Sequence, residues 1–182
     1  LPDPVERIAK SLLGPDFMFD LVGLLMAFPG AGDQRHHADA TLYPGTPLDG
    51  LLQPFALAFA QPLVEMNERS GRTAFWLRSH RKGSAEGPWD FAPVAGPGSA
   101  LLWDFRTFHA GLANTSGQLR PVLYNVLCRH WWCEYLPPET ALYEKLRVAR
   151  DVYEDLDPRW RQRLRRARVV DPHPYGTPYA DN

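Results

Sequence analysis

The sequence has few cysteines, no long apolar run and no excess of charge of one sign, and each absence excludes a class of protein. Among its 182 residues only Cys128 and Cys133 are cysteines, which is too few for a disulfide framework. No apolar run reaches the ~18 residues that a membrane span requires. The formal net charge of −1 argues against a nucleic-acid binder, whose surface is usually basic. We therefore expect neither a membrane nor a nucleic acid as partner.

The two cysteines and the N-terminus bear on location. Cys128 and Cys133 flank His130, which could suggest zinc, but no fourth ligand accompanies them and a structural role for reduced thiols is favoured. The sequence begins at Leu1 and shows no signal-peptide pattern, so the N-terminal boundary is left open while a cytoplasmic location is expected.

The composition that is present favours one globular domain with an all-β core. Hydrophobic residues make up 45% and charged residues 23%, and 18 prolines and 14 glycines punctuate short apolar segments, as in a β-rich domain with many turns. A jelly roll therefore fits better than an α/β fold. The predicted strands are Met18–Phe28, Gln34–Leu42, Phe55–Met66, Thr73–Leu77, Ser99–Phe105 and Pro121–His130.

The two ends of the chain predict helices. Pro4–Leu13 has the pattern of a short amphipathic helix, and Pro138–Arg168 alternates leucines with charges as a longer one would. We expect a single domain over residues 1–182, with the jelly-roll core at about 16–135 and a helical C-terminal extension at 138–168. Arginines crowd the end of that extension, and they predict either a solvated helix end or a site for an anionic substrate such as a coenzyme A thioester.

His37-Ala38-Asp39 is the motif with the clearest chemistry. In a strand, residues i and i+2 point to the same face, so His37 and Asp39 can reach one metal ion while His36 points away. A later histidine, His109, would complete two imidazoles and one carboxylate, the ligand set of mononuclear non-haem Fe(II) oxygenases. Arg120 follows His109 closely enough to hold the far carboxylate of a co-substrate.

Several separate motifs, in one order, make the chain from Asp16 to about Trp132 resemble the phytanoyl-CoA dioxygenase family of Fe(II)/2-oxoglutarate oxygenases. The matching segments are Gln34-Arg35-His36-His37-Ala38-Asp39, Met66 to Phe75, Ser79-His80, Gly98 to Asp104 leading into His109, and Asn114-Thr115-Ser116 ahead of Arg120-Pro121.

The resemblance implies a double-stranded β-helix with iron held by His37, Asp39 and His109. It also implies that Arg120 pairs with the C5 carboxylate of 2-oxoglutarate, a task suited to a guanidinium's forked donors. Gln34 and Thr73 are candidates for further co-substrate contacts or, equally, for structural roles.

The chain departs from the family in one place. Where the family usually has Pro-Gly-Ser-His, this sequence has Leu77-Arg78-Ser79-His80, which puts the local turn in doubt and leaves Arg78 as an anion-binding side chain or an exposed loop charge. Asp39 itself separates oxygenation from halogenation. Related halogenases replace this carboxylate with a small residue so that chloride can bind iron. Because the carboxylate is present here, oxygenation is favoured.

The function expected is an Fe(II)- and 2-oxoglutarate-dependent dioxygenase that hydroxylates a C–H bond of a small organic substrate with O₂. Desaturation, epoxidation or epimerisation on the same site remain alternatives, as does a non-catalytic metal-binding jelly-roll domain. The substrate and the oligomeric state, a homodimer included, are left open.

Overall fold

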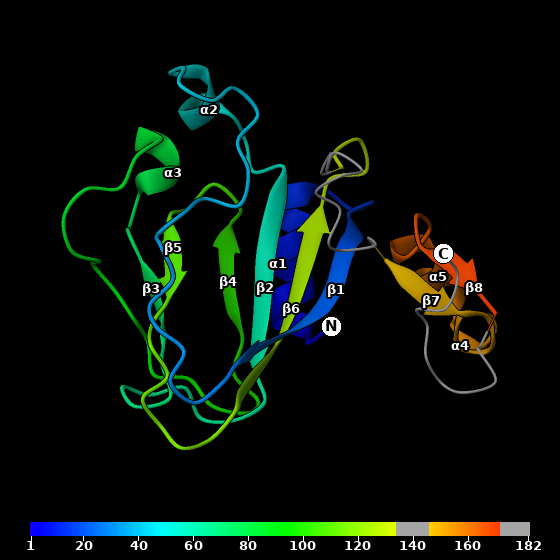
Figure 1. Ribbon diagram of the computed structural model, residues 1–182. Coiled ribbons are helices and arrows are strands. Elements are labelled where there is room, and N and C mark those ends of the chain that lie inside the picture. The colour runs from blue at the N-terminus through cyan, green and yellow to red at the C-terminus, as the bar shows by residue number, and fades with distance from the viewer. Residues whose placement is uncertain (134–145, 172–182) are drawn as a thin grey trace.

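The computed structural model describes residues 1–133 and 146–171. Four strands form one sheet in which they lie side by side, and the remaining short strands and the helices are arranged around this sheet (Figure 1). The elements in chain order are α1 (Asp3–Leu13), β1 (Met18–Ala27), α2 (Leu48–Leu51), β2 (Ala56–Pro62), β3 (Thr73–Phe75), α3 (Ser79–Lys82), β4 (Leu101–Asp104), β5 (His109–Gly111), β6 (Arg120–Cys128), β7 (Arg147–Ala149), α4 (Arg150–Asp155), α5 (Pro158–Arg163) and β8 (Arg168–Val170).

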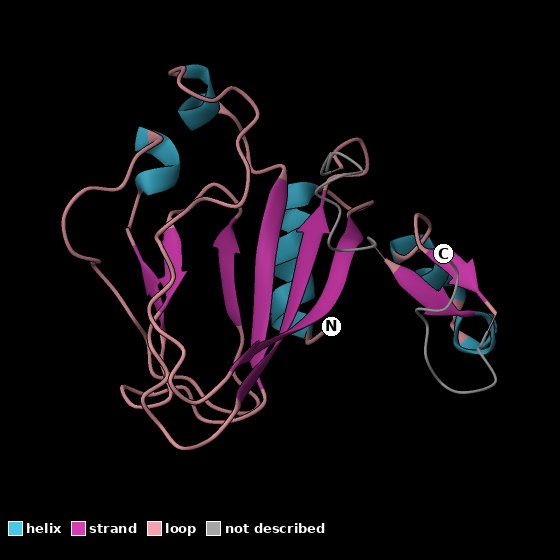
Figure 2. Cartoon of the chain, in the orientation of Figure 1, coloured by secondary structure: helices cyan, strands magenta, loops and turns pink. Residues whose placement is uncertain are grey.

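The main sheet is antiparallel, with strand order β1-β6-β2-β4 (Figure 1). Figure 2 shows its strands as magenta arrows beside a cyan helix, α1. On β2, Ala56, Ala58 and Ala60 belong to one buried cluster, while Leu57 and Phe59 belong to another. Because successive residues of a strand point to opposite faces, both faces of the sheet are buried at this strand. The face with the larger side chains packs against α1, and the face with the alanines turns toward the candidate site.

A second, two-stranded sheet pairs β3 with β5, and β3 packs onto the inner face of the main sheet. The contact joins Phe75 on β3 to Trp103 on β4, with ring centroids 5.3 Å apart in an edge-to-face arrangement. Aromatic pairs of this geometry stabilise packing beyond the area that they bury. The result is a mostly β-sheet core with few helices, as the sequence predicts.

One predicted strand is wrong. Within the described residues Gln34–Leu42 forms no continuous ladder: it makes a single antiparallel bridge, between His37 and His109, and a separate backbone hydrogen bond from Gln34 to Gly111. The backbone of Asp39 bonds instead to Phe105, on the far side of a turn that interrupts the partner segment. A turn on one side prevents the regular spacing that a ladder requires. The other predicted strands and the helix at Pro4–Leu13 are confirmed within a few residues.

The C-terminal extension is not one helix where the structure describes it. Residues 146–171 form two short helices, α4 and α5, and a parallel pair of strands, β7 and β8. Asp157 caps a new helix by accepting a hydrogen bond from the backbone of Trp160, and Pro158 occupies the first helical position. Both residues favour the start of a helix, so a new helix begins there instead of one long helix continuing. The first part of the predicted helix, residues 138–145, lies outside the described residues.

Arginines of the extension are largely occupied by contacts within the protein. Arg163 donates to the carbonyls of Pro15 and Phe17, and its guanidinium lies 3.6 Å from the Phe17 ring centroid. Arg166 donates to the carbonyls of Trp132 and His130 at the end of β6. These contacts favour a structural role over a coenzyme A site for the arginines that make them.

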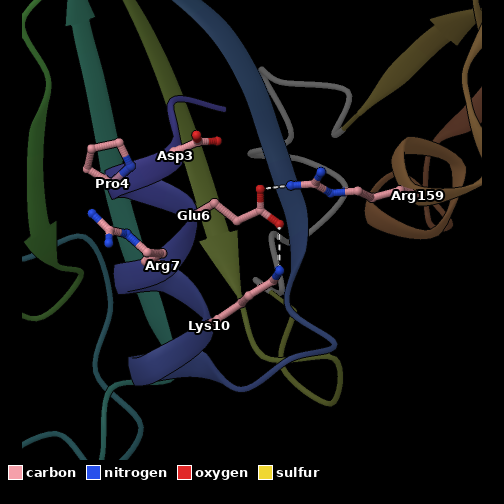
Figure 3. A pocket seen from close by; sticks show the side chains of 6 residues that line it. All are labelled: Asp3, Pro4, Glu6, Arg7, Lys10 and Arg159. Atoms are coloured by element: carbon pink, nitrogen blue, oxygen red, sulfur yellow. Dashed lines mark ion pairs between the residues drawn. The ribbon is translucent and has the colours of Figure 1, made fainter.

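A surface pocket shows the same connection between the two ends of the chain. The buried carboxylate of Glu6 on α1 pairs with Lys10 on the same helix and with Arg159 from α5 (Figure 3). A buried carboxylate with cationic partners avoids most of the cost of losing water. The C-terminal segment is therefore tied to α1 by charge.

Within residues 1–133 and 146–171, no helix has the length and apolar content needed to cross a membrane.

Asn114 joins the end of β1 to the connection between β5 and β6. Its fully buried side-chain amide donates to the carbonyl of Ala27 (3.0 Å) and to that of Gln118 (2.8 Å). Its side-chain oxygen accepts from the Ser116 hydroxyl at 2.6 Å. This network holds the loop from which β6 begins.

We predict that Asn114→Ala lowers the free energy of unfolding by about 2–3 kcal/mol, because the hydrogen bonds and the packing of a fully buried side chain are lost. Chemical denaturation measures the change. Thr115→Ala, which removes an exposed hydroxyl that donates to the carbonyl of Arg69 (3.1 Å), is the matched control and should cost no more than about 1 kcal/mol. Equal effects of the two variants would contradict a special role for the buried amide.

The two thiols differ in environment, and neither is in a disulfide. Cys128 is buried, and burial raises the pKa of its thiol to about 12, whereas Cys133 is exposed. The thiolate is the reactive form, so a thiol with a raised pKa is almost entirely unreactive near pH 8. We expect iodoacetamide to label only Cys133 in the folded protein and both cysteines after denaturation, as measured by intact mass. Labelling of Cys128 without unfolding would contradict this packing.

Candidate functional site

The backbone brings His37 and His109 face to face. The N–H of His37 donates to the carbonyl of His109 (3.0 Å), and the N–H of His109 donates to the carbonyl of His37 (2.9 Å). Directly opposite residues of an antiparallel pair place their side chains on the same side. The two imidazole centroids are accordingly 4.6 Å apart.

Asp39 completes a cluster that could hold a metal ion. Its Oδ1 lies 3.6 Å from Nε2 of His37 and 3.7 Å from Nε2 of His109. One candidate ligand atom from each of the three side chains lies within 4.8 Å of the others. Two imidazoles and one carboxylate suit Fe(II) and leave positions open for other ligands. The structure thus brings together the three residues that the sequence singles out.

Each imidazole is oriented by its other nitrogen. Nδ1 of His37 lies 2.9 Å from the carbonyl of Arg35, and Nδ1 of His109 lies 3.0 Å from the carbonyl of Thr107. A carbonyl only accepts, so Nδ1 carries the proton and donates, and Nε2 keeps its lone pair for a ligand. Both lone pairs therefore belong to the nitrogens that face Asp39.

Tyr124 is a site residue that the sequence reasoning missed. Its hydroxyl donates to Oδ2 of Asp39 at 2.9 Å. Tyr124 lies on β6 four residues after Arg120, and strand alternation places both on one face of the sheet. That spacing is the signal from which Tyr124 could have been found.

The electrostatics of the cluster favour binding a cation. Burial raises the pKa of Asp39, while His109, the Tyr124 hydrogen bond and His37 oppose that shift. Burial lowers the pKa of His109, and Asp39 opposes that shift. A neutral imidazole is the form that binds a metal. A cation beside the buried carboxylate would offset the cost of its burial.

The predicted co-substrate residues gather around Gly111, at the other end of β5 from His109. The side-chain oxygen of Gln34 accepts from the Gly111 N–H at 2.8 Å, and Thr73 is the cross-strand partner of Gly111. A Cβ added at Gly111 would lie 2.9 Å from the Gln34 oxygen and 3.5 Å from Nη2 of Arg120. Glycine is therefore what permits these side chains to approach β5.

Arg120 is a partly buried cation at this end of the cluster. Burial lowers the pKa of its guanidinium, and within the described residues its Nε has no hydrogen-bond partner. A buried guanidinium without a carboxylate partner is a costly arrangement that a bound anion would relieve. The place is suited to a carboxylate.

Aromatic side chains divide between the cluster and the opposite face. The Trp103 ring centroid is 5.1 Å from that of His109, so Trp103 forms a wall of the site. Trp76 instead contacts His36, with centroids 5.0 Å apart. His36 thus points away from the cluster, as strand alternation predicts. Phe105 packs on Trp132 at 5.5 Å and belongs to the core.

The chain still turns at Leu77-Arg78-Ser79-His80, although this segment departs from the Pro-Gly-Ser-His pattern of the family. Arg78 has φ 63° and ψ 6°, the left-handed conformation, although it is not glycine. That conformation costs a non-glycine residue about 1–2 kcal/mol. The Ser79 hydroxyl donates to the carbonyl of Trp76 (2.6 Å) and accepts from the N–H of Phe108 (2.8 Å). The turn therefore supports the residue that precedes His109, and the exposed Arg78 lies at its start.

Comparison with solved structures shows a shared fold. One similar chain is a non-heme monooxygenase, ThoJ, in complex with nickel, with 20% identity and a TM-score of 0.57 over 70% of this chain and 50% of that one. Another is the non-heme alpha-ketoglutarate-dependent epimerase SnoN from nogalamycin biosynthesis, with 19% identity and a TM-score of 0.55 over 69% of this chain and 52% of that one. This chain thus spans about half the length of these two structures. No curated protein matches.

The family assignment comes from the sequence model of phytanoyl-CoA dioxygenase (PhyH), which matches residues 2–122. That match includes the three clustered side chains and Arg120. The chain belongs to the phytanoyl-CoA dioxygenase (PhyH) family.

Proposed function

We propose that this protein is an Fe(II)- and 2-oxoglutarate-dependent dioxygenase that hydroxylates a C–H bond of a small organic substrate with O₂, releasing succinate and CO₂. The observation that carries the proposal is the convergence of His37, Asp39 and His109, with both Nε2 atoms beside one carboxylate oxygen. Membership of the PhyH family supports the same reaction class.

The proposal includes the fold. The antiparallel main sheet, together with the β3–β5 pair packed on its inner face, supports a double-stranded β-helix (jelly-roll) core at about residues 16–135 of a single domain. In this arrangement the cluster lies between the two sheets, with the side chains of His109 and Asp39 largely buried and that of His37 45% exposed. The exposed side of His37 is where ligands would reach the cluster from solvent.

In this assignment His37, Asp39 and His109 are the ligands that hold Fe(II). Bound iron would supply the activation of O₂, coupled to decarboxylation of 2-oxoglutarate. The protein's part is to present three ligands on one side and leave the other positions open. The carbonyls of Arg35 and Thr107 keep both imidazoles in the tautomer that binds a metal.

Arg120 would bind the far carboxylate of 2-oxoglutarate. Its guanidinium lies near Gly111, and β5 runs from there to His109, so the co-substrate would extend along this strand. Gln34 and Thr73 flank Gly111 and would contact the same molecule. The absence of a carboxylate partner for Nε of Arg120 in the described residues supports this role.

Epimerisation is the second candidate, because SnoN, which shares the fold, is an alpha-ketoglutarate-dependent epimerase. Both reactions would use the same cluster of His37, Asp39 and His109. Analysis of the product is therefore the measurement that separates hydroxylation from epimerisation. Incorporation of an oxygen atom from ¹⁸O₂ into the product supports hydroxylation. A non-catalytic metal-binding domain would form no succinate from 2-oxoglutarate.

We predict that His109→Ala abolishes the weak visible charge-transfer band that forms when Fe(II) and 2-oxoglutarate are added without oxygen, because one of three ligands is lost. His36→Ala is the matched control, since His36 packs on Trp76 away from the cluster. It should keep the band. Normal binding of both ligands by His109→Ala would show the metal assignment to be wrong.

We predict that Arg120→Ala weakens 2-oxoglutarate binding by about 100-fold, as expected for the loss of two charge-assisted hydrogen bonds of roughly 1.5 kcal/mol each. Iron binding should change little. Anaerobic titration with each ligand measures both effects. The exposed Arg69→Ala variant is the control for a lost positive charge, and an equal loss in that variant would refute a specific carboxylate contact.

A further inference from the structure

Asp39 is held by two contacts of different kinds. Its backbone N–H donates to the carbonyl of Phe105 at 3.1 Å, and its Oδ2 accepts from the Tyr124 hydroxyl at 2.9 Å. The segment that carries Asp39 forms no strand beyond the bridge at His37. The Tyr124 bond is thus the side-chain contact that connects the Asp39 carboxylate to the main sheet.

The two oxygens of the carboxylate do different things. Oδ1 lies 3.6 Å and 3.7 Å from the two imidazole Nε2 atoms, and Oδ2 is bonded to Tyr124. We propose that Tyr124 is a positioning residue that makes Asp39 offer one oxygen, Oδ1, to the metal. This inference rests on the proposed function, because it assumes that the cluster binds a divalent metal.

The consequence concerns the number of open positions. A carboxylate can bind a metal through one oxygen or through both. Binding through both would occupy one more position of a six-coordinate ion. Two positions are needed for the chelating end of 2-oxoglutarate and one for O₂. With Oδ2 held by the phenol, the three protein ligands occupy three positions and leave the required three.

Tyr124 is well placed for this task because its backbone is fixed on both sides. In the main sheet it lies opposite Gly23 of β1 and opposite Ala60 of β2. Both neighbours are small, so the phenol has room on the inner face of the sheet. Its ring centroid lies 6.1 Å from that of Trp103, which itself contacts His109. A residue in the middle strand of a ladder cannot move without disturbing both neighbours.

Tyr124→Phe tests the inference because it removes the hydroxyl and keeps the ring. We expect Co(II), used as a spectroscopic substitute for Fe(II), to bind about 10- to 100-fold more weakly. That is the usual effect of losing a hydrogen bond to a side chain that binds the metal. The visible absorption of bound Co(II) should also change, because Asp39 is free to bind through both oxygens. Tyr153→Phe, on the C-terminal helix α4, is the matched control and should match the wild type in both measurements.

The outcomes separate the two proposals. Wild-type affinity and an unchanged Co(II) spectrum in Tyr124→Phe would overturn the positioning role alone. Failure of the wild-type protein to bind Co(II) or Fe(II) would overturn the proposed function, and this inference with it. Thermal melting of the metal-free proteins tests for a purely structural effect. A lowered melting temperature with an unchanged Co(II) spectrum would assign Tyr124 to packing and reject the inference.

Discussion

The reciprocal hydrogen bonds between His37 and His109 are the contact on which the site depends. They join a loop near the N-terminal end of the chain to the start of β5, far along the sequence. Because the two residues lie directly opposite each other, their imidazoles project to one side, and Asp39 follows two residues later on that same side. A shift of this pairing by one residue would replace His37 with His36, whose ring lies against Trp76.

The surrounding sheet gives this bridge a fixed frame. The inner face of β2 carries alanines, which pack with Phe75 and Trp103, while the outer face carries larger side chains that pack on α1. The C-terminal segment is tied to the same region by Arg163, whose guanidinium bonds to the connection between α1 and β1. Hydrophobic side chains thus pack on both faces of the sheet, and those on the inner face include Trp103, which contacts His109.

Burial disfavours the charged forms of two side chains in this site, and a bound ligand of opposite charge would offset that cost. Asp39 and Arg120 are both charged groups whose pKa values are shifted by burial against their charged forms. One would be relieved by a cation and the other by an anion. In the proposed function, an iron ion and a dicarboxylate would together satisfy both demands, so the two halves would act as one site.

The sequence by itself determined the candidate ligand residues and most strands, because these follow from alternation and from residue chemistry. It selected His37 over His36 and identified Asp39, His109 and Arg120 as the residues of interest. Only the tertiary structure decided that residues 34–42 are a loop with one bridge, that Arg163 and Arg166 bind backbone carbonyls, and that Tyr124 donates a hydrogen bond to Asp39. Those features depend on contacts between segments distant in sequence, which local periodicity does not encode.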